Sequence, residues 1–304
     1  MGALCENFRT RTLPQLPTFE IAKETAVPVQ LLNDYQMHYE VFGQGPPMVM
    51  IHGGLGGGEG SAAFVEHQAT ALSRRFRLIV YDRRAAGRSS TPDLGYSIEN
   101  YAQDLHSLLE HLDVSSAYVL GSSAGGPIAM QFALEHPEMT DSLILINTMS
   151  YVQERERAVR QGELDQIQAD EAELGREAST ERALESRWPG LRENQPVKFQ
   201  QLVDINLDRF EGIVSTIQSY LDIGDSIESR LSQISMPTVI IHGDADSRIP
   251  FSCSQQLQDS IPGSELYIVP GAEHGLLSNE PELVRRVMIQ FLERVAPKAG
   301  IASN

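Results

Sequence analysis

A serine flanked by glycines is the first feature of the sequence that could do chemistry. Residues 121–125 read G-S-S-A-G, which matches the pattern G-x-S-x-G with Ser123 at its centre. A strand is predicted at 117–120 and a helix at 126–135, and a sharp turn between them would lift the serine hydroxyl above a sheet. Because the pattern requires this context, we interpret Ser123 as a nucleophile rather than as part of a flexible loop.

A serine hydroxyl is a weak nucleophile at neutral pH and needs a general base. The best candidate is His274, which lies just after the last predicted strand. The acid that orients this histidine should follow the preceding strand, where both Asp244 and Asp246 occur. The resulting chain order of serine, aspartate and histidine is one of the orders in which catalytic triads occur.

Acyl transfer by a serine also needs N–H donors for the oxyanion of the tetrahedral intermediate. A glycine-rich segment, 52–58, follows the first apolar strand. We assign one donor to the N–H of Gly54, with Leu55 as the alternative. The second donor is assigned to the N–H of Ala124, the residue after the serine.

The elements that must position these residues alternate along the chain. Six short runs, apolar on both faces, end at 51, 81, 120, 146, 241 and 269, which is typical of buried parallel strands. Helical patterns fill most of the gaps, and a β-hairpin (27–32 and 35–42) precedes them. The pattern predicts an α/β fold with a mostly parallel, twisted sheet flanked by helices. In such sheets ligands meet the carboxyl ends of the strands, where the candidate residues lie.

One gap between strands is too long for a single crossover. From about 149 to 235 the chain is helical, polar and charged, and we interpret it as an inserted helical cap that walls a pocket. The predicted division of the chain is an N-terminal tail (1–25), a core in two parts (26–148 and 236–298), the cap (149–235) and a C-terminal tail (299–304).

The cap offers aromatic side chains for substrate binding. The candidates are Trp188, Phe210 and Tyr220, together with Leu55 from the core. Packing between the cap helices is the alternative role for the three aromatic residues.

The composition excludes several classes of protein. Among 304 residues, 24 Lys and Arg oppose 41 Asp and Glu, so the net charge of −17 disfavours nucleic acids and anionic membranes as partners. Two cysteines form no disulfide framework, and the first residues lack the pattern of a signal peptide, so a cytoplasmic location is expected. Much of the acidity falls in 163–185, either on a solvated helix face or on a lid that disfavours anionic substrates.

On these residues the chain resembles the α/β-hydrolase superfamily, in particular its cap-bearing esterase and lactonase branch, over about 27–297. The matching pieces are H-G-G at 52–54, D-R-R-A-A-G-R-S at 82–89, the serine turn, G-x-x-D-x-x-x-P at 243–250, and His274 followed by Glu280-Pro281. The resemblance implies Asp246 rather than Asp244 as the acid of the triad. Two positions depart from the pattern: Ala85 replaces the usual glycine, and Glu273 stands where a small residue is common.

The resemblance implies a serine hydrolase that cleaves a small-to-medium, neutral carboxylic ester or lactone through an acyl-enzyme. A small molecule is the expected partner, with no cofactor and no metal, and the oligomeric state is not indicated. Carbon–carbon bond hydrolysis and cofactor-free perhydrolysis use the same triad and stay open.

Two further classes compete with a hydrolase. A G-x-G-x-x-A match at 58–63, followed by Asp82, would suit an NADP-dependent oxidoreductase. That interpretation leaves Ser123, Asp246 and His274 unexplained. A hydrolase-like binding protein without turnover is the other alternative, and a complete apparent triad argues against it.

Overall fold

The computed structural model describes residues 29–54, 60–150, 154–223 and 226–295. The expected tails at 1–25 and 299–304, Leu55, and the start of the G-x-G-x-x-A match lie outside the described residues. The described strands form one sheet in the order β1-β2-β4-β3-β5-β6-β7-β8. They are β1 (Val29–Leu32), β2 (Tyr35–Phe42), β3 (Pro47–Ile51), β4 (Arg77–Tyr81), β5 (Ala117–Ser122), β6 (Thr140–Ile146), β7 (Thr238–Gly243) and β8 (Glu265–Val269).

The sheet is antiparallel only at one edge. β1 and β2 form the predicted hairpin, and β2 pairs with β4 in antiparallel register. From β4 to β8 every neighbouring pair is parallel. The predicted mostly parallel α/β sheet is therefore confirmed, and runs that are apolar on both faces form its central strands because both faces are covered.

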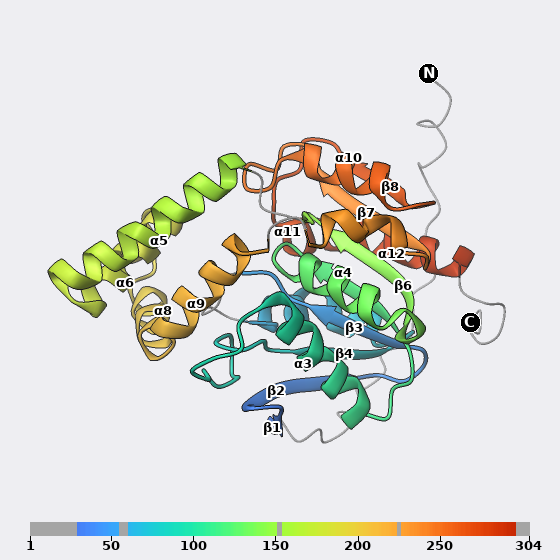
Figure 1. The fold of residues 1–304 in the computed structure, drawn as a ribbon, viewed down its shortest axis with the longest axis horizontal. Coiled ribbons are helices and arrows are strands. Elements are labelled where there is room, and N and C mark those ends of the chain that lie inside the picture. Colours follow the sequence, from blue (N-terminus) through green and yellow to red (C-terminus); the bar gives the residue numbers. More distant parts are fainter. Residues whose placement is uncertain (1–28, 55–59, 151–153, 224–225, 296–304) are drawn as a thin grey trace.

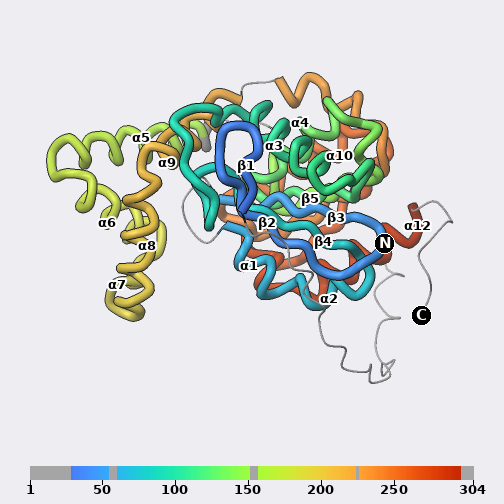
Figure 2. Tube along the Cα trace, turned by 90° about the horizontal axis from the view of Figure 1, so that it is seen from below, coloured from blue at the N-terminus to red at the C-terminus, as the bar shows by residue number. Residues whose placement is uncertain are grey.

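Helices cover both faces of this sheet (Figure 2). On one face pack α3 (Ile98–His111), α4 (Gly125–Glu135) and α10 (Phe251–Ser260), through apolar side chains such as Leu105 and Phe132. On the other face pack α1 (Ala62–Phe64), α2 (Thr70–Leu72) and α12 (Pro281–Val295), through side chains such as Phe64 and Phe291. The shorter elements are η1 (Val65–Ala69), η2 (Pro137–Met139), η3 (Glu228–Gln233) and α11 (Leu276–Asn279).

Between β6 and β7 the chain leaves the sheet and forms a series of α-helices, which Figure 1 shows projecting to one side of the sheet. They are α5 (Glu154–Leu174), α6 (Arg176–Arg187), α7 (Leu191–Asn194), α8 (Pro196–Asp208) and α9 (Phe210–Leu221). We call residues 154–221 the helical insertion. Two small apolar clusters hold it together, one between α6 and α8 and one between α5 and α9.

The helix α9 joins the insertion to the sheet domain. The hydroxyl of Tyr101 on α3 and Thr216 Oγ1 on α9 lie 3.0 Å apart, and Arg209 Nη2 donates to the carbonyl of Gly87 (2.5 Å). No helix within the described residues is long and apolar enough to cross a membrane.

Candidate active site

The carboxyl ends of six neighbouring strands bring the candidate residues together. Each strand is followed within a few residues by one or two polar or glycine positions of the site. In sheet order these are Arg83 after β4, Gly53 and Gly54 after β3, Ser123 after β5, Asn147 after β6, Asp246 after β7 and His274 after β8.

Ser123 sits on a strained turn between β5 and α4. Its φ is +51°, a left-handed value that non-glycine residues rarely adopt. The two glycines of the motif allow this turn to lie close to its neighbours. A Cβ at Gly121 would lie 2.6 Å from the carbonyl oxygen of Gly125, and a Cβ at Gly125 would lie 2.2 Å from that of Ile51. The G-x-S-x-G pattern therefore follows from steric limits at this turn.

A chain of hydrogen bonds links Ser123, His274 and Asp246. His274 Nδ1 donates to Asp246 Oδ2 (2.7 Å), because a carboxylate can only accept. The other ring nitrogen, Nε2, is then free to accept from Ser123 Oγ, at 2.9 Å. The His274 side chain keeps 18% of its surface accessible whereas Asp246 is enclosed, so the imidazole can reach a bound molecule.

Asp246 is held from every side. Its Oδ1 accepts from the main-chain N–H groups of Arg248 (2.8 Å) and Ile249 (2.9 Å), and its Oδ2 also accepts from Asn147 Nδ2 (2.6 Å). Burial acts to raise the pKa of Asp246, but the hydrogen bonds and the charge of His274 outweigh burial and lower that pKa. Asp246 thus stays ionised and aimed at His274. Asn147 was not predicted as a site residue; its position directly after an apolar strand was the available signal.

The two other acidic side chains near this network lie apart from it. Asp244 accepts from the main-chain N–H of Gly271 (2.6 Å) and is exposed. Glu273 is also exposed, and its carboxylate accepts from the hydroxyl of Ser247 (3.1 Å). The structure therefore brings Asp246, and not Asp244, to His274.

The buried guanidinium of Arg83 sets the orientation of the peptide between Gly53 and Gly54. Arg83 Nη2 donates to the carbonyl oxygens of Gly53 (3.0 Å) and Gly54 (2.5 Å), and His52 Nδ1 also donates to Gly53 (2.7 Å). The N–H of a trans peptide points opposite to its C=O, so these donors set the direction of the Gly54 N–H. The loop lies against the serine, since a Cβ at Gly53 would be 3.0 Å from Ser123 Cβ.

The peptide between Ser123 and Ala124 is fixed in the same way. Thr148 Oγ1 (2.6 Å) and the N–H of Gly126 (2.9 Å) both donate to the carbonyl of Ser123, which sets the direction of the Ala124 N–H. Within the described part of the chain, neither this N–H nor that of Gly54 donates a hydrogen bond. Both are therefore available to an acceptor bound at Ser123. Thr148 carried no sequence signal for this role.

Tyr220, on α9 of the insertion, links Arg83 to the peptide that follows Ala124. Its hydroxyl donates to the carbonyl of Ala124 and accepts from Arg83 Nη1 (3.1 Å). Burial raises the pKa of Tyr220, so the hydroxyl remains protonated and able to donate. The sequence suggested Tyr220 as a pocket wall, and the structure places it in the cavity wall with this additional set of hydrogen bonds.

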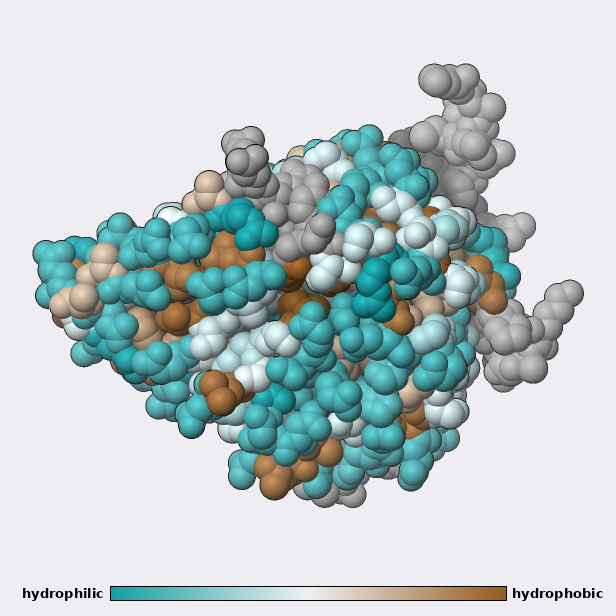
Figure 3. Space-filling model, in the orientation of Figure 1, coloured by the Kyte–Doolittle hydropathy of each residue, from teal (hydrophilic) through white to brown (hydrophobic). Residues whose placement is uncertain are grey.

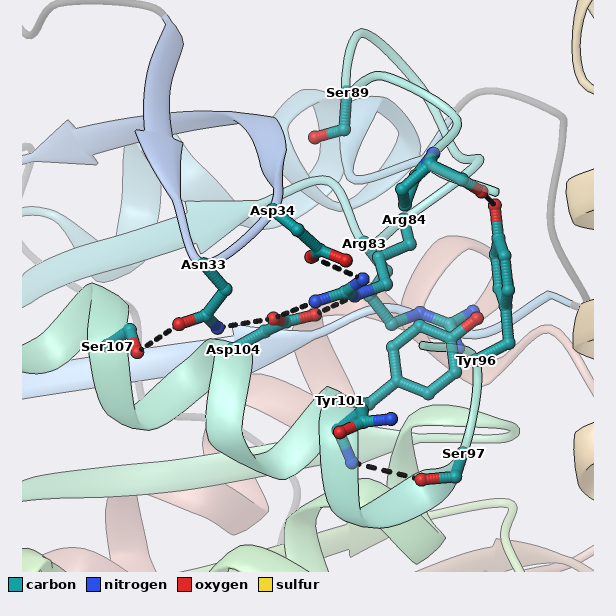
Figure 4. A network of polar contacts seen from close by, with 12 residues as sticks. Asn33, Asp34, Arg83, Arg84, Ser89, Tyr96, Ser97, Tyr101, Asp104 and Ser107 are labelled. Carbon is teal, nitrogen blue, oxygen red and sulfur yellow. Dashed lines mark hydrogen bonds and ion pairs between the residues drawn. The ribbon is translucent and has the colours of Figure 1, made fainter. Parts of the chain in front are cut away.

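The turn that carries Arg83 is anchored by its neighbour (Figure 4). Arg84 donates twice to Asp104 on α3, from Nε (2.6 Å) and Nη2 (2.7 Å), and pairs with Asp34 (2.7 Å). Arg84 thus has carboxylate partners, whereas Arg83 contacts carbonyl and hydroxyl oxygens. This anchoring fixes the main chain from which Arg83 extends.

Ala85, which departs from the family pattern, has a φ of +54°. This left-handed value explains why glycine is usual there. The methyl group fits because Gly212 of α9 faces it: a Cβ at Gly212 would lie 2.4 Å from Ala85 Cβ. The alanine and the glycine are therefore complementary across the joint between core and insertion.

A cavity of about 1160 Å³ opens over Ser123 and His274. Phe210 and Tyr220 line it, with other apolar side chains of α9 such as Ile217. Trp188 is not among the described lining residues; it packs against the cluster between α6 and α8, which is the alternative role given for it above. A role of Phe210 and Tyr220 in substrate binding stays a prediction.

Of the residues offered for a dinucleotide, Asp82 is engaged elsewhere. Asp82 is buried and accepts from the N–H (2.7 Å) and hydroxyl (2.8 Å) of Ser61 and from the N–H of Arg88 (2.9 Å). It is therefore not free to bind a ribose. Among the described residues no group of three or more His, Cys, Asp or Glu side chains could hold a metal ion.

Comparisons with known proteins agree on the fold. Residues 46–281 match the family model of the alpha/beta hydrolase fold. The chain is 26% identical over 262 residues to a Serratia proteamaculans protein named "Putative carbamate hydrolase RutD", a match covering 84% of this chain and 96% of that protein.

Solved structures show the same fold. An esterase from Exiguobacterium antarcticum has a TM-score of 0.71 and 23% identity, covering 87% of this chain and 98% of its own. The enol-lactonase from Burkholderia xenovorans LB400 has a TM-score of 0.71 and 22% identity, covering 88% of this chain and 100% of its own. At these identities the likeness concerns the fold.

Proposed function

The chain belongs to the α/β-hydrolase family, and from that premise we propose that it is a serine hydrolase that cleaves a carboxylic ester or lactone through an acyl-enzyme. The observation that carries the proposal is the hydrogen-bond chain from Ser123 through His274 to Asp246, at the floor of a cavity. A serine nucleophile attacks acyl carbonyls, whereas a carboxylate nucleophile would favour other reactions of this family.

In the proposed mechanism, Ser123 Oγ attacks the carbonyl carbon while His274 Nε2 takes its proton. Asp246 holds the imidazole tautomer and stabilises the imidazolium that forms. The N–H groups of Gly54 and Ala124 stabilise the oxyanion, because their peptides are held in place before the substrate binds. His274 then protonates the leaving alcohol, and an activated water hydrolyses the acyl-enzyme.

Arg83, Thr148 and Tyr220 are positioning residues in this proposal. They hold the carbonyl ends of the peptides that carry or adjoin the oxyanion donors. Asn147 plays the equivalent part for Asp246. None of them exchanges a proton with the substrate.

We further propose that residues 149–235 act as a cap. Support comes from the cavity, which is lined by α5, α6 and α9 on one side and by the strand ends on the other. Its volume suits small to medium substrates. The names of the relatives differ in the type of bond that is cleaved, because they include a carbamate hydrolase, an esterase and a lactonase.

A panel of esters and lactones of varied acyl length tests the proposal, with Ser123→Ala as the control. We expect turnover by the natural chain and a kcat lower by at least ~10³-fold in Ser123→Ala, with folding unchanged. Undiminished turnover by Ser123→Ala would exclude Ser123 as the nucleophile. Diketones and hydrogen peroxide as co-substrates extend the panel to carbon–carbon cleavage and perhydrolysis.

A further inference from the structure

Two arginines in the cavity wall have no carboxylate partner among the described residues. Arg187 is the last residue of α6, and Arg248 follows Asp246 after β7. One therefore comes from the insertion and the other from the core, and both line the cavity that contains Ser123. They are close enough that the charge of Arg248 lowers the pKa of Arg187.

The other arginines of this cavity are neutralised. Arg160 donates to Glu163 (2.7 Å), and Arg182 donates to Asp170 (2.8 Å). These two pairs cancel within the cavity wall. With Asp246 included and the histidines counted as neutral, the described lining holds four arginines against three carboxylates, a net charge of +1.

Arg187 and Arg248 are exposed side chains that also line the cavity. The guanidinium of Arg187 lies over the ring of Trp188, with Cζ 4.9 Å from the ring centroid. The surrounding protein, together with the charges of Arg248 and Arg160, lowers the pKa of Arg187 to about 10, so it remains charged at neutral pH. An anion bound between these two like charges would relieve their repulsion.

The acidic side chains of the insertion do not offset these charges. Of the eight acidic residues in 163–185, only Glu163 and Asp170 line the cavity, and both are paired with arginines. Several others pair on exposed faces, for example Glu171 with Arg176 (2.6 Å). Figure 3 shows a hydrophilic outer surface over α5 and α6. The expectation of a lid that repels anions therefore does not fit the cavity wall.

We propose that Arg187 and Arg248 form a carboxylate-binding subsite, so that the substrate is an ester or lactone carrying a carboxylate away from the scissile carbonyl. Planar guanidinium groups match the geometry of a carboxylate, and the apolar side chains of α9 would contact the chain between the two ends. The inference rests on the proposed function for the reaction, but binding of the anion does not require turnover.

Two esters with the same six-carbon acyl chain test the subsite. One is p-nitrophenyl hexanoate, and the other is the p-nitrophenyl monoester of adipic acid, which ends in a carboxylate. Arg187→Gln and Arg248→Gln should each lower kcat/KM for the charged ester about tenfold or more, mainly through KM, as expected for loss of a charge-assisted hydrogen bond. The neutral ester should change by less than about twofold.

Arg192→Gln is the matched control. It removes one positive charge from the same insertion, but Arg192 pairs with Glu181 and Glu185 and is not among the described lining residues. We expect it to leave the ratio of the two esters unchanged. If the three variants change that ratio equally, or none changes it, the subsite is wrong even though Ser123-dependent hydrolysis persists.

Calorimetric titration of the Ser123→Ala protein with adipate separates binding from chemistry. We expect adipate to bind, and to bind at least about tenfold more weakly when Arg187 is replaced by Gln. If adipate binds and its binding depends on the arginines, but the natural chain hydrolyses no ester, then the proposed function is wrong and the subsite stands. No binding, or equal binding in both proteins, would overturn the subsite.

Discussion

The strand ends of the core and the outer helices of the insertion are held together by different forces. Around Asp246 and Ser123, buried hydrogen bonds of 2.6–2.9 Å fix each group from several sides. Across α5 to α8, exposed ion pairs such as Arg192–Glu181 (3.0 Å) join small apolar clusters. Exposed pairs contribute only about 0–1 kcal/mol each. The proposed reacting groups are thus fixed more firmly than the cavity walls that the insertion contributes.

This difference suggests a division of labour. Cavity-facing side chains on the insertion can change without disturbing the proposed triad, because the triad is positioned by strands. The exception is α9, where Tyr220 contacts the Ala124 peptide and Gly212 packs on Ala85. Substitutions in each region in turn should separate effects on the chemical step from effects on the packing of the insertion against the core.

The largest expected effect is on chemistry in the core. Asp246→Asn should lower kcat by about 10³-fold or more, because the amide no longer holds the required tautomer of His274. Asp244→Asn should change kcat by less than about threefold, since Asp244 contacts Gly271 and not His274. Steady-state kinetics with an activated ester distinguishes them, and the reverse order of effects would exchange the two acids.

At the joint, Gly212→Ala should destabilise the fold by about 1–3 kcal/mol, because its Cβ would lie 2.4 Å from that of Ala85. Gly162→Ala on α5 is the control. A Cβ there meets nothing within 4 Å, and alanine favours helix by about 0.5–1 kcal/mol. Urea unfolding of both variants measures this contrast. Equal stabilities would mean that α9 does not pack closely on the core.

Lowering the pH should reduce the stability of the core rather than that of the insertion. Burial lowers the pKa of His52 to about 4, so the folded chain keeps it neutral while the unfolded chain protonates it near pH 6.5. This contribution is fully present well above pH 6.5 and is lost as the pH falls toward 4, by about 2 kcal/mol between pH 7.5 and 5. The insertion, 154–221, contains no histidine. Urea unfolding at pH 7.5 and 5 should show a smaller loss in His52→Gln, and an identical loss would contradict the assignment.

The smallest expected effect is at the hydroxyl that links the two regions. Tyr220→Phe should lower kcat about tenfold with little change in KM, because the hydrogen bonds to Ala124 and Arg83 are lost. Tyr101→Phe removes a different contact between core and insertion, to Thr216, and should leave kcat within about twofold. If both variants change kcat equally, Tyr220 serves only to pack α9 against the core.

The sheet and Ser123, Asp246 and His274 could be found from the sequence because their signals are local. Apolar runs identify buried strands, and the residues that follow them share one edge. Asn147 and Thr148 followed such a run but lacked a motif. Arg83 lies in the D-R-R-A-A-G-R-S stretch without a role of its own, and only the fold turns it toward the carbonyls of Gly53 and Gly54.

The insertion was harder to predict from sequence for a physical reason. Trp188 and Phe210 are both aromatic residues at helix ends in the insertion, and their roles depend on how the helices pack. Net acidity was equally misleading, because most acidic side chains of 163–185 lie away from the cavity while Arg187 and Arg248 line it. Composition reports the amount of charge and not the direction in which side chains point.

Covalent trapping tests the central claim most directly. Diethyl p-nitrophenyl phosphate phosphorylates an activated serine and releases p-nitrophenol, and peptide mass spectrometry locates the adduct. We expect one adduct on Ser123 and none on its neighbour Ser122, no adduct at this site in Ser123→Ala, and much slower labelling in Asp246→Asn. Labelling of a different residue that abolishes hydrolysis, or undiminished ester hydrolysis after Ser123 is fully modified, would contradict the proposed mechanism.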